Sequence, residues 1–293
     1  MLFPKLKMVV IYVEYDLEKY PSSFEHLKSY LSKVGGERIR YIRVNNKDTG
    51  TGSRNLGDNT IYLQGSNVDR EFSGWQRGIE FVRSSNVKFD VVLFVNEAFE
   101  ATGASYLKNS NINWMILKSH VLGAVIGFID TRWEKIRLNN RGVRIWINTN
   151  CFFVPHSLLT KMSTIITVDN SCMSKYLPEQ FPSDGELFEL TAPINNAYKN
   201  HMVEWITEEW HNKIDLNDRT WPIFRSKVKA MLNEASLSIR IRELGYIILP
   251  YSIPMFVYRK IRGAFRKAKK AVLQERRGSI KDAFLSSTND IER

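Results

Sequence analysis

Two polar residues that directly follow a buried strand are the first candidates for chemistry in this chain. Residues 91–95, VVLFV, form a continuous and mostly β-branched run, typical of a parallel strand that helices cover on both faces. Open α/β sheets bind their ligands at the carboxyl ends of such strands. We therefore expect Asn96 and Glu97 to face a ligand. The alternative is that the pair only caps the next helix.

A basic and an acidic residue begin the helix that precedes this strand. The apolar stripe of that helix, predicted from about residue 69 to 82, has steps of three and four: Phe72, Trp75, Ile79 and Val82. Arg70 and Glu71 lie at its start, where an arginine is well placed to meet an anionic group. The alternative for this pair is an ion pair on the surface.

The first fifty residues have the pattern of a strand, a helix and a second strand. Residues 8–13 and 39–44 are apolar and β-branched, and a helical stripe from about Ser23 to Val34 ends at two glycines. Such an order predicts a right-handed βαβ unit. Residues 47–59 are polar and rich in glycine, so we expect a loop there, and they lack the spacing of a P-loop.

The rest of the chain continues to alternate between strand and helix patterns. Strands are predicted at 121–130, 145–155 and 246–249, and helices at about 198–214 and 226–244. The predicted fold is therefore an α/β fold with a mixed, mostly parallel sheet flanked by helices.

Composition narrows the function classes. The chain has 293 residues and two cysteines, and neither a zinc-ligand spacing nor an apolar stretch of about twenty residues is present. No signal peptide is expected at the N-terminus. We expect a cytoplasmic protein with one α/β domain over 1–250, whose halves are 1–100 and 101–250.

The net charge of +11 is concentrated in a C-terminal tail, predicted at residues 251–293. Between Met255 and Lys281 there are ten Lys or Arg and a single acid, and an apolar stripe runs through the same segment. A basic amphipathic helix of this kind lies on anionic membranes. Nucleic acid would attract the same charge, but the apolar stripe favours lipid, so no nucleic-acid partner is expected.

The order of these elements resembles a known enzyme family. Residues 67–79, NVDREFSGWQRGI, followed by Phe94-Val95-Asn96-Glu97, are similar to the centre of inverting, family-2-like bacterial glycosyltransferases of the GT-A fold. Enzymes of that family build O-antigens and capsules. In them a turn with asparagine and glycine leads through a helix to a D-x-D group, and Asn96-Glu97-Ala98 departs from that group.

The resemblance assigns a nucleotide-sugar site to the ends of the first strands. It implies a UDP-, GDP- or dTDP-sugar donor, and Mg²⁺ or Mn²⁺ near Glu97, although the missing D-x-D puts the metal in doubt. The implied donor-site residues are Val13, Glu14, Tyr15, Asn45, Asn46, Asn67, Arg70, Glu71, Asn96 and Glu97.

Further roles follow from the same resemblance. Asn148 and Asn150 would line the sugar pocket, and their alternative is a strand edge. Glu234, in a helix followed by Gly245-Tyr246, would be the catalytic base, and the alternative is an exposed helix glutamate paired with Lys227, Arg240 or another basic side chain. Two tryptophans of the acceptor half, Trp205 and Trp210, could stack on sugar rings, although burial in the core is favoured.

The resemblance thus implies a hexosyltransferase that acts on a lipid-linked glycan at the inner face of the cell membrane. The main alternative is a membrane-associated scaffold that keeps the fold without the chemistry, and the other is a nucleic-acid-binding protein.

Overall fold

A computed structural model describes residues 5–102, 104–183, 185–210 and 212–252. The chain divides into a unit of Met1–Tyr251 and a second unit of Ser252–Arg293. From residue 253 on, the predicted basic tail lies outside the described residues. Among the helices that are described, none is long and apolar enough to cross a membrane.

The first unit is built on an eight-stranded sheet with the order β3-β4-β2-β1-β5-β7-β6-β8. β3 and β7 run against the direction of the other strands. The strands are β1 Met8–Glu14, β2 Ile39–Thr49, β3 Ser53–Gly57, β4 Thr60–Gly65, β5 Val91–Asn96, β6 Ala124–Leu138, β7 Arg141–Pro155 and β8 Ile247–Pro250. This mostly parallel sheet confirms the predicted fold class.

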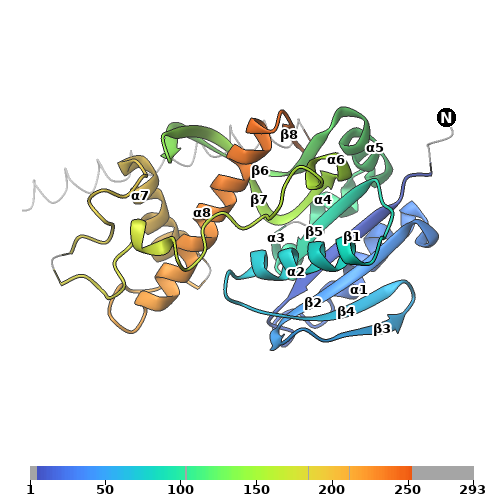
Figure 1. Cartoon of the computed structure of the whole chain (residues 1–293), viewed down its shortest axis with the longest axis horizontal. Helices are drawn as coiled ribbons and strands as arrows, with labels where there is room; N and C mark the ends of the chain where they lie inside the picture. The colour runs from blue at the N-terminus through green and yellow to red at the C-terminus, as the bar shows by residue number, and fades with distance from the viewer. Residues whose placement is uncertain (1–4, 103, 184, 211, 253–293) are drawn as a thin grey trace, which may run out of the picture. The chain divides into compact units, whose positions relative to one another are not determined.

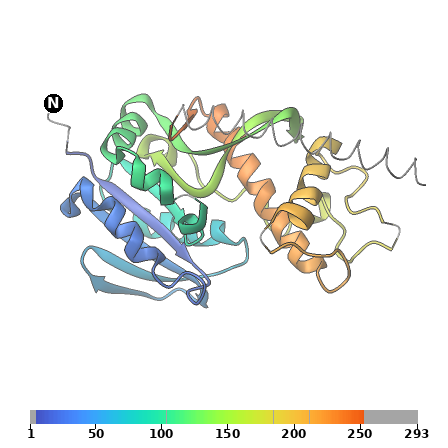
Figure 2. The ribbon, with the colours of Figure 1, turned by 180° about the vertical axis from the view of Figure 1, so that it is seen from behind.

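Helices cover both faces of the sheet, as Figures 1 and 2 show from opposite sides. α2, α6 and α8 pack on one face, and α1, α3, α4 and α5 pack on the other. The helices are α1 Ser23–Leu31, α2 Glu71–Ser84, α3 Phe99–Thr102, α4 Ala104–Asn109, α5 Ile112–Leu122, α6 His156–Leu159, α7 Asn196–Glu204 and α8 Trp221–Glu243, with a π-helical turn, η4, at Trp205–Glu209.

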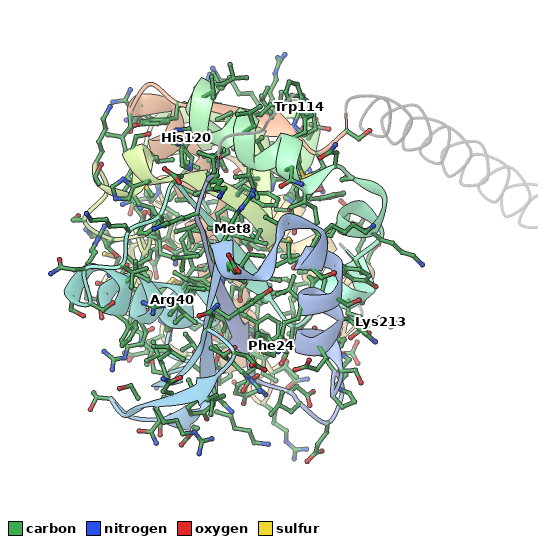
Figure 3. All side chains as sticks on the ribbon, turned by 90° about the vertical axis from the view of Figure 1, so that its right-hand side faces the viewer. Met8, Phe24, Arg40, Trp114, His120 and Lys213 are labelled. Atoms are coloured by element: carbon green, nitrogen blue, oxygen red, sulfur yellow. The ribbon has the colours of Figure 1, made fainter. Side chains whose placement is uncertain are left out.

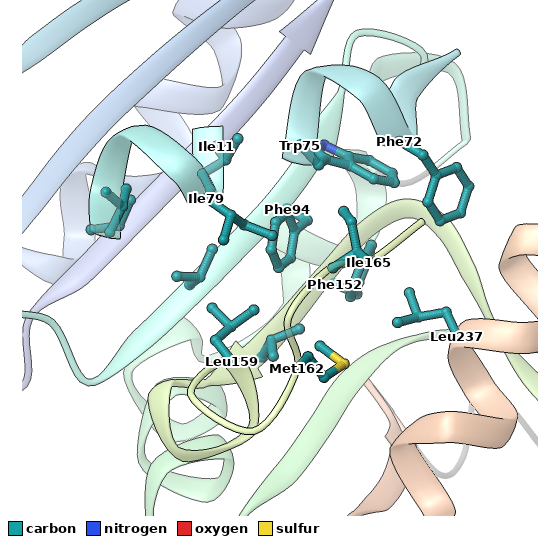
Figure 4. Close-up of a cluster of buried hydrophobic side chains, with 14 of the residues drawn as sticks. Ile11, Phe72, Trp75, Ile79, Phe94, Phe152, Leu159, Met162, Ile165 and Leu237 are labelled. Carbon is teal, nitrogen blue, oxygen red and sulfur yellow. The ribbon is translucent and has the colours of Figure 1, made fainter. Parts of the chain in front are cut away.

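Two glycines let α2 approach the central strand closely. A Cβ at Gly78 would lie 2.4 Å from Ile11 Cγ2, and one at Gly74 would lie 2.6 Å from Val13 Cγ2. The helix therefore rests almost directly on β1. Beside it, the indole of Trp75 donates a hydrogen bond to the Val95 carbonyl at 3.2 Å, and Trp75 belongs to the apolar cluster drawn in Figure 4.

The opposite face is closed by an aromatic group under α1. Phe24 points from α1 toward the sheet (Figure 3), and its ring centroid lies 5.1 Å from that of Tyr12 and 5.7 Å from that of Tyr41. β1 is thus buried on both sides, which explains its continuous apolar sequence.

A third apolar cluster lies where the β6–β7 hairpin extends past the sheet. The hairpin turns at Asn139 and Asn140, which have φ values of 49° and 61° and so form a two-residue turn of the kind that favours asparagine. Beyond the sheet, the hairpin packs against α7 and the first half of α8. This cluster supports the far wall of the site described below.

Three predicted boundaries are wrong. The expected loop at 47–59 contains the end of β2 and the edge strand β3, whose residues are all exposed and therefore lack an apolar pattern. The strand expected from residue 121 begins at Ala124, because Val121 and Leu122 end α5 and Gly123 adopts a left-handed φ of 59°. The helix expected at 198–214 stops at Glu204 and continues as the π-turn η4.

Candidate functional site

A cleft of about 570 Å³ opens at the carboxyl ends of β1 and β5. The chain places β2 and β4 on one side of β1 and then crosses to β5 on the other side, so these two ends meet at a topological switch point. Such points are where open α/β sheets bind ligands. The remaining walls come from β6, β7, η4 and α8.

Glu97, at the carboxyl end of β5, ties the two strand ends together. Its carboxylate accepts the backbone N–H of Tyr15 at 2.8 Å and that of Asp16 at 2.8 and 2.9 Å. Burial raises the pKa of the Glu97 carboxyl, while the two N–H donors oppose the shift. Its visible role is therefore to hold the loop after β1 against β5.

This arrangement fits a bound divalent metal poorly. Mg²⁺ is usually bound by one or two carboxylates beside the phosphates of a substrate, and the Glu97 oxygens are already engaged by backbone donors. Across the described part of the chain, no group of three or more His, Cys, Asp or Glu could hold a metal ion, so a site built of protein ligands alone is absent there. The departure from D-x-D at residues 96–98 agrees with this geometry.

A row of amides crosses the floor of the cleft. β7 runs antiparallel to β5 with Cys151 opposite Val95, and this register brings Asn150 beside Asn96. The Asn96 amide donates to Asn150 Oδ1 at 3.4 Å, while Asn96 Oδ1 is buried without a hydrogen-bond partner. Asn148 Nδ2 donates to Asp130 Oδ2 at 3.1 Å. An unpartnered amide oxygen and short polar side chains suit the hydroxyl groups of a sugar.

Glu234 projects from the middle of α8 into the same cleft. Its Oε1 accepts the Thr149 backbone N–H at 2.7 Å and lies 3.1 Å from the Thr149 hydroxyl. Burial, and then the charge of Asp130, raise the pKa of the Glu234 carboxyl to about 8. The ion-pair alternative is not observed, because Lys227 lies over tryptophan rings and Arg240 donates to the Thr164 carbonyl.

Two tryptophans form part of the cleft wall. In the π-turn η4 the Trp210 N–H bonds to the Trp205 carbonyl at 2.7 Å, so the two rings stack with centroids 6.2 Å apart. Both side chains are only partly buried and line the cleft. The expectation of burial in the core is met in part, because both rings pack against the third apolar cluster, while the five-residue turn also leaves them facing the cleft.

Two cations lie against this wall. Lys227 Nζ lies 5.1 Å from the centre of the Trp205 ring and 4.9 Å from that of Trp210, and the Arg70 guanidinium lies 5.9 Å from the Trp210 ring. Burial lowers the pKa of both groups. A buried cation gains stability from an anionic neighbour, so this wall suits an anionic ligand.

The cleft contains most of the predicted site residues: Val13, Tyr15, Asn46, Asn67, Arg70, Glu71, Asn96, Glu97, Asn148, Asn150 and Glu234. Two others do not line it. Glu14 is fully buried on the other side of β1 and pairs with Arg43 Nε at 2.6 Å, and Asn45 Oδ1 accepts the N–H groups of Lys47 and Asp48.

Sequence reasoning missed several lining residues: Asp16, Asp130, Thr131, Arg132 and Lys227. A signal existed for Lys227, which precedes Glu234 by seven residues and so lies on the same face of a helix two turns earlier. Asp130 and Arg132 carried no local signal, because only the long β6–β7 hairpin brings them to the cleft.

We compared the chain with protein families, curated proteins and solved structures. No protein-family model and no curated protein matches the sequence. Among solved structures, the chain shows a weak likeness to a mannosyltransferase, PcManGT from Pyrobaculum calidifontis, in complex with GDP-Man and Mn²⁺. That match has 10% identity and a TM-score of 0.35, and it covers 89% of this chain and 80% of that chain. A likeness at this level carries no functional argument, so function is inferred from the cleft.

Proposed function

We propose that the protein is a glycosyltransferase that moves a sugar from a nucleotide-sugar donor to a lipid-linked or polysaccharide acceptor with inversion. The observation that carries the proposal is one cleft with a carboxyl of raised pKa, Glu234, on α8 and a cationic wall at Arg70 and Lys227. Glycosyl transfer needs a base for the incoming hydroxyl and positive charge for the leaving diphosphate.

In this proposal the acceptor hydroxyl attacks the anomeric carbon in a single displacement. Its proton passes to a Glu234 oxygen, the carbon–oxygen bond to the diphosphate breaks, and the negative charge leaves with the nucleoside diphosphate. One displacement inverts the anomeric centre. The Thr149 N–H holds one Glu234 oxygen, so the other oxygen is left to receive the proton.

The donor would lie across the ends of β1 and β5. The Tyr15 ring is half exposed at the rim of the cleft, where it can stack on a base, and the amides of Asn96 and Asn150 can bind sugar hydroxyls. Which nucleotide and which sugar are bound is tested by a thermal-shift panel of UDP-, GDP-, dTDP- and CMP-sugars, each in EDTA and in Mn²⁺.

Glu234→Gln tests the central assignment. The amide cannot take a proton, so release of nucleoside diphosphate from the donor that stabilises the protein should fall by roughly a hundredfold or more. Donor binding should remain. Glu209→Gln is the matched control, since Glu209 is another carboxylate that lines the same cleft. Full turnover in Glu234→Gln, or an equal loss in both variants, would refute the assignment.

The scaffold alternative makes a separate prediction. A protein without chemistry would neither hydrolyse nor transfer the sugar of any nucleotide-sugar that binds in the panel. Turnover of a bound donor therefore separates the enzyme from a scaffold with the same fold.

We further propose a place of action at an anionic membrane surface, reached through residues 255–281, in the synthesis of cell-surface polysaccharide. The support is the local charge and apolar stripe of that segment. Sedimentation with anionic vesicles should pull down the full chain and not a chain that ends at residue 252. Equal sedimentation of both, or equal binding of the full chain to duplex DNA at the same salt, would contradict the proposal.

A further inference from the structure

The two cations of the cleft wall have no carboxylate partner in the described part of the chain. The ion pairs seen there within 4.0 Å include neither Arg70 nor Lys227. Glu71 and Glu234 lie near enough to favour the charged form of Lys227, but neither reaches ion-pair distance. The two positive charges also oppose each other, since Arg70 disfavours the charged form of Lys227. Leaving a partly buried pair of like charges in this state costs free energy that an anion would offset.

Arg70 is held in place against local strain. Its φ of 54° is rare for a residue with a Cβ, and such outliers persist where the surroundings enforce them, often at functional sites. The enforcing contacts are a hydrogen bond from Asn46 Nδ2 to the Arg70 carbonyl at 2.8 Å and one from Arg70 Nε to Ser226 Oγ at 3.0 Å. The bonded Nε leaves the terminal nitrogens of the guanidinium available to a ligand.

Lys227 lies over two aromatic faces, and no acid of the described residues reaches ion-pair distance of it. The π-turn stacks Trp205 and Trp210, and the ammonium group lies about equally far from both rings. Cation–π contacts position a cation without neutralising it. Lys227 and Arg70 share the Trp210 ring, so the two cations form one unit on α8 and at the start of α2.

We propose that Arg70 and Lys227 clamp the diphosphate of the donor and supply the charge stabilisation for which other enzymes use a divalent metal. Donor binding and sugar transfer then require no divalent cation. This inference rests on the proposed function for its substrate, and it accounts for two observations: the metal-poor donor set, and a carboxylate at the end of β5 that is committed to backbone N–H groups. The clamp acts on the leaving group, as the carbon–oxygen bond breaks and the diphosphate gains charge.

Calorimetric titration of the full chain with inorganic pyrophosphate tests the clamp without knowledge of the nucleotide. We expect pyrophosphate to bind in EDTA. Lys227→Gln and Arg70→Gln should each weaken that binding roughly tenfold or more, because each removes a charge-assisted contact. Lys213→Gln is the control, an exposed lysine outside the cleft that should leave affinity unchanged. Binding that appears only with Mg²⁺ or Mn²⁺, or that survives both substitutions, would overturn the proposal.

A conservative variant separates charge from a merely structural role. Lys227→Arg keeps a cation over the tryptophans, so it should retain most of the pyrophosphate affinity that Lys227→Gln loses. A cooperative thermal unfolding transition, measured for each variant, checks that the variant is folded. Equal losses in Lys227→Arg and Lys227→Gln would mean that charge is not the cause, and the clamp would fail.

The clamp and the proposed function can fail separately. If pyrophosphate binds without metal in a way that depends on Arg70 and Lys227 while no nucleotide-sugar is turned over, that result would support the clamp and contradict the glycosyltransferase proposal. Turnover of a nucleotide-sugar that EDTA abolishes and Mn²⁺ restores would support the glycosyltransferase proposal and contradict the clamp.

Discussion

The raised pKa of Glu234 makes a prediction about stability that needs no substrate. An acid with a pKa near 8 in the folded protein keeps its proton between pH 5 and 7, whereas the unfolded chain has lost it at an ordinary pKa of 4.5. The stabilising contribution is therefore fully present below about pH 4.5 and is lost as the pH rises through about 8. Above that pH, the folded protein must hold an extra buried charge.

The size of this contribution to the unfolding free energy follows from the shift in the Glu234 pKa. A rise from 4.5 to about 8 corresponds to about 5 kcal/mol at 1.36 kcal/mol per unit. Because the cleft admits water, we expect about half of this. Glu234→Gln should remove the effect, so relative to wild type the variant should gain about 2 to 3 kcal/mol of unfolding free energy between pH 5 and pH 9.

Denaturant unfolding of both proteins at pH 5, 7 and 9 measures this difference. Glu209→Gln serves as the control, since it removes a carboxylate that lines the same cleft and is not among the groups that raise the Glu234 pKa. Parallel pH curves for wild type and Glu234→Gln would refute the buried, protonated Glu234 on which the mechanism depends.

The same group sets the pH dependence of activity. A base works only when deprotonated, and with a pKa of about 8 roughly a tenth of Glu234 is in that form at pH 7 and about nine tenths at pH 9. The transfer rate should therefore rise between these values and then level. Asp130→Asn removes a charge that raises this pKa, so its profile should shift to lower pH. A flat wild-type profile, or an unshifted Asp130→Asn profile, would contradict this role of Glu234.

Two further predictions concern the support of the cleft. Gly78→Ala should lower the unfolding free energy by about 1 to 3 kcal/mol, because its Cβ would lie 2.4 Å from Ile11 Cγ2. Glu80→Ala, on the exposed face of α2, is the control and should change the unfolding free energy little. Equal urea midpoints for Gly78→Ala and wild type would contradict the close packing of α2 on β1. Asn46→Ala removes the donor that holds the Arg70 carbonyl and should weaken pyrophosphate binding several-fold in EDTA, which calorimetry measures. Unchanged affinity would mean that Arg70 does not need this support.

The local periodicity of the sequence predicted the helix and the strand that border the cleft. The stripe of α2 and the apolar run of β5 appear within two residues of their predicted bounds, because each is encoded by neighbours along the chain. α8 ends at Glu243, one residue before its predicted end, and Gly245 follows with a left-handed φ of 85°. The placing of polar residues at the carboxyl ends of β1 and β5 follows from the same strand patterns.

Other features depended on packing between distant segments. Alternation along a strand puts Val13 and Glu14 on opposite faces, but only the covering helices decide which face borders the cleft. The exposed strand β3 has no apolar face to encode, so its pairing with β4 leaves no trace in the sequence.

The cationic wall of the cleft shows most clearly which features local sequence patterns do not predict. Residues five apart lie on different faces of an α-helix, so an α-helical pattern would separate Trp205 from Trp210. The tertiary structure instead closes a π-turn between them and brings both rings under Lys227. The sequence by itself determined the main buried strands and helices and the polar residues at their ends, because these depend on near neighbours, whereas it did not predict the exposed strand β3 or the π-turn η4. Only the tertiary structure decided which charges meet across the cleft, because their partners are far apart along the chain.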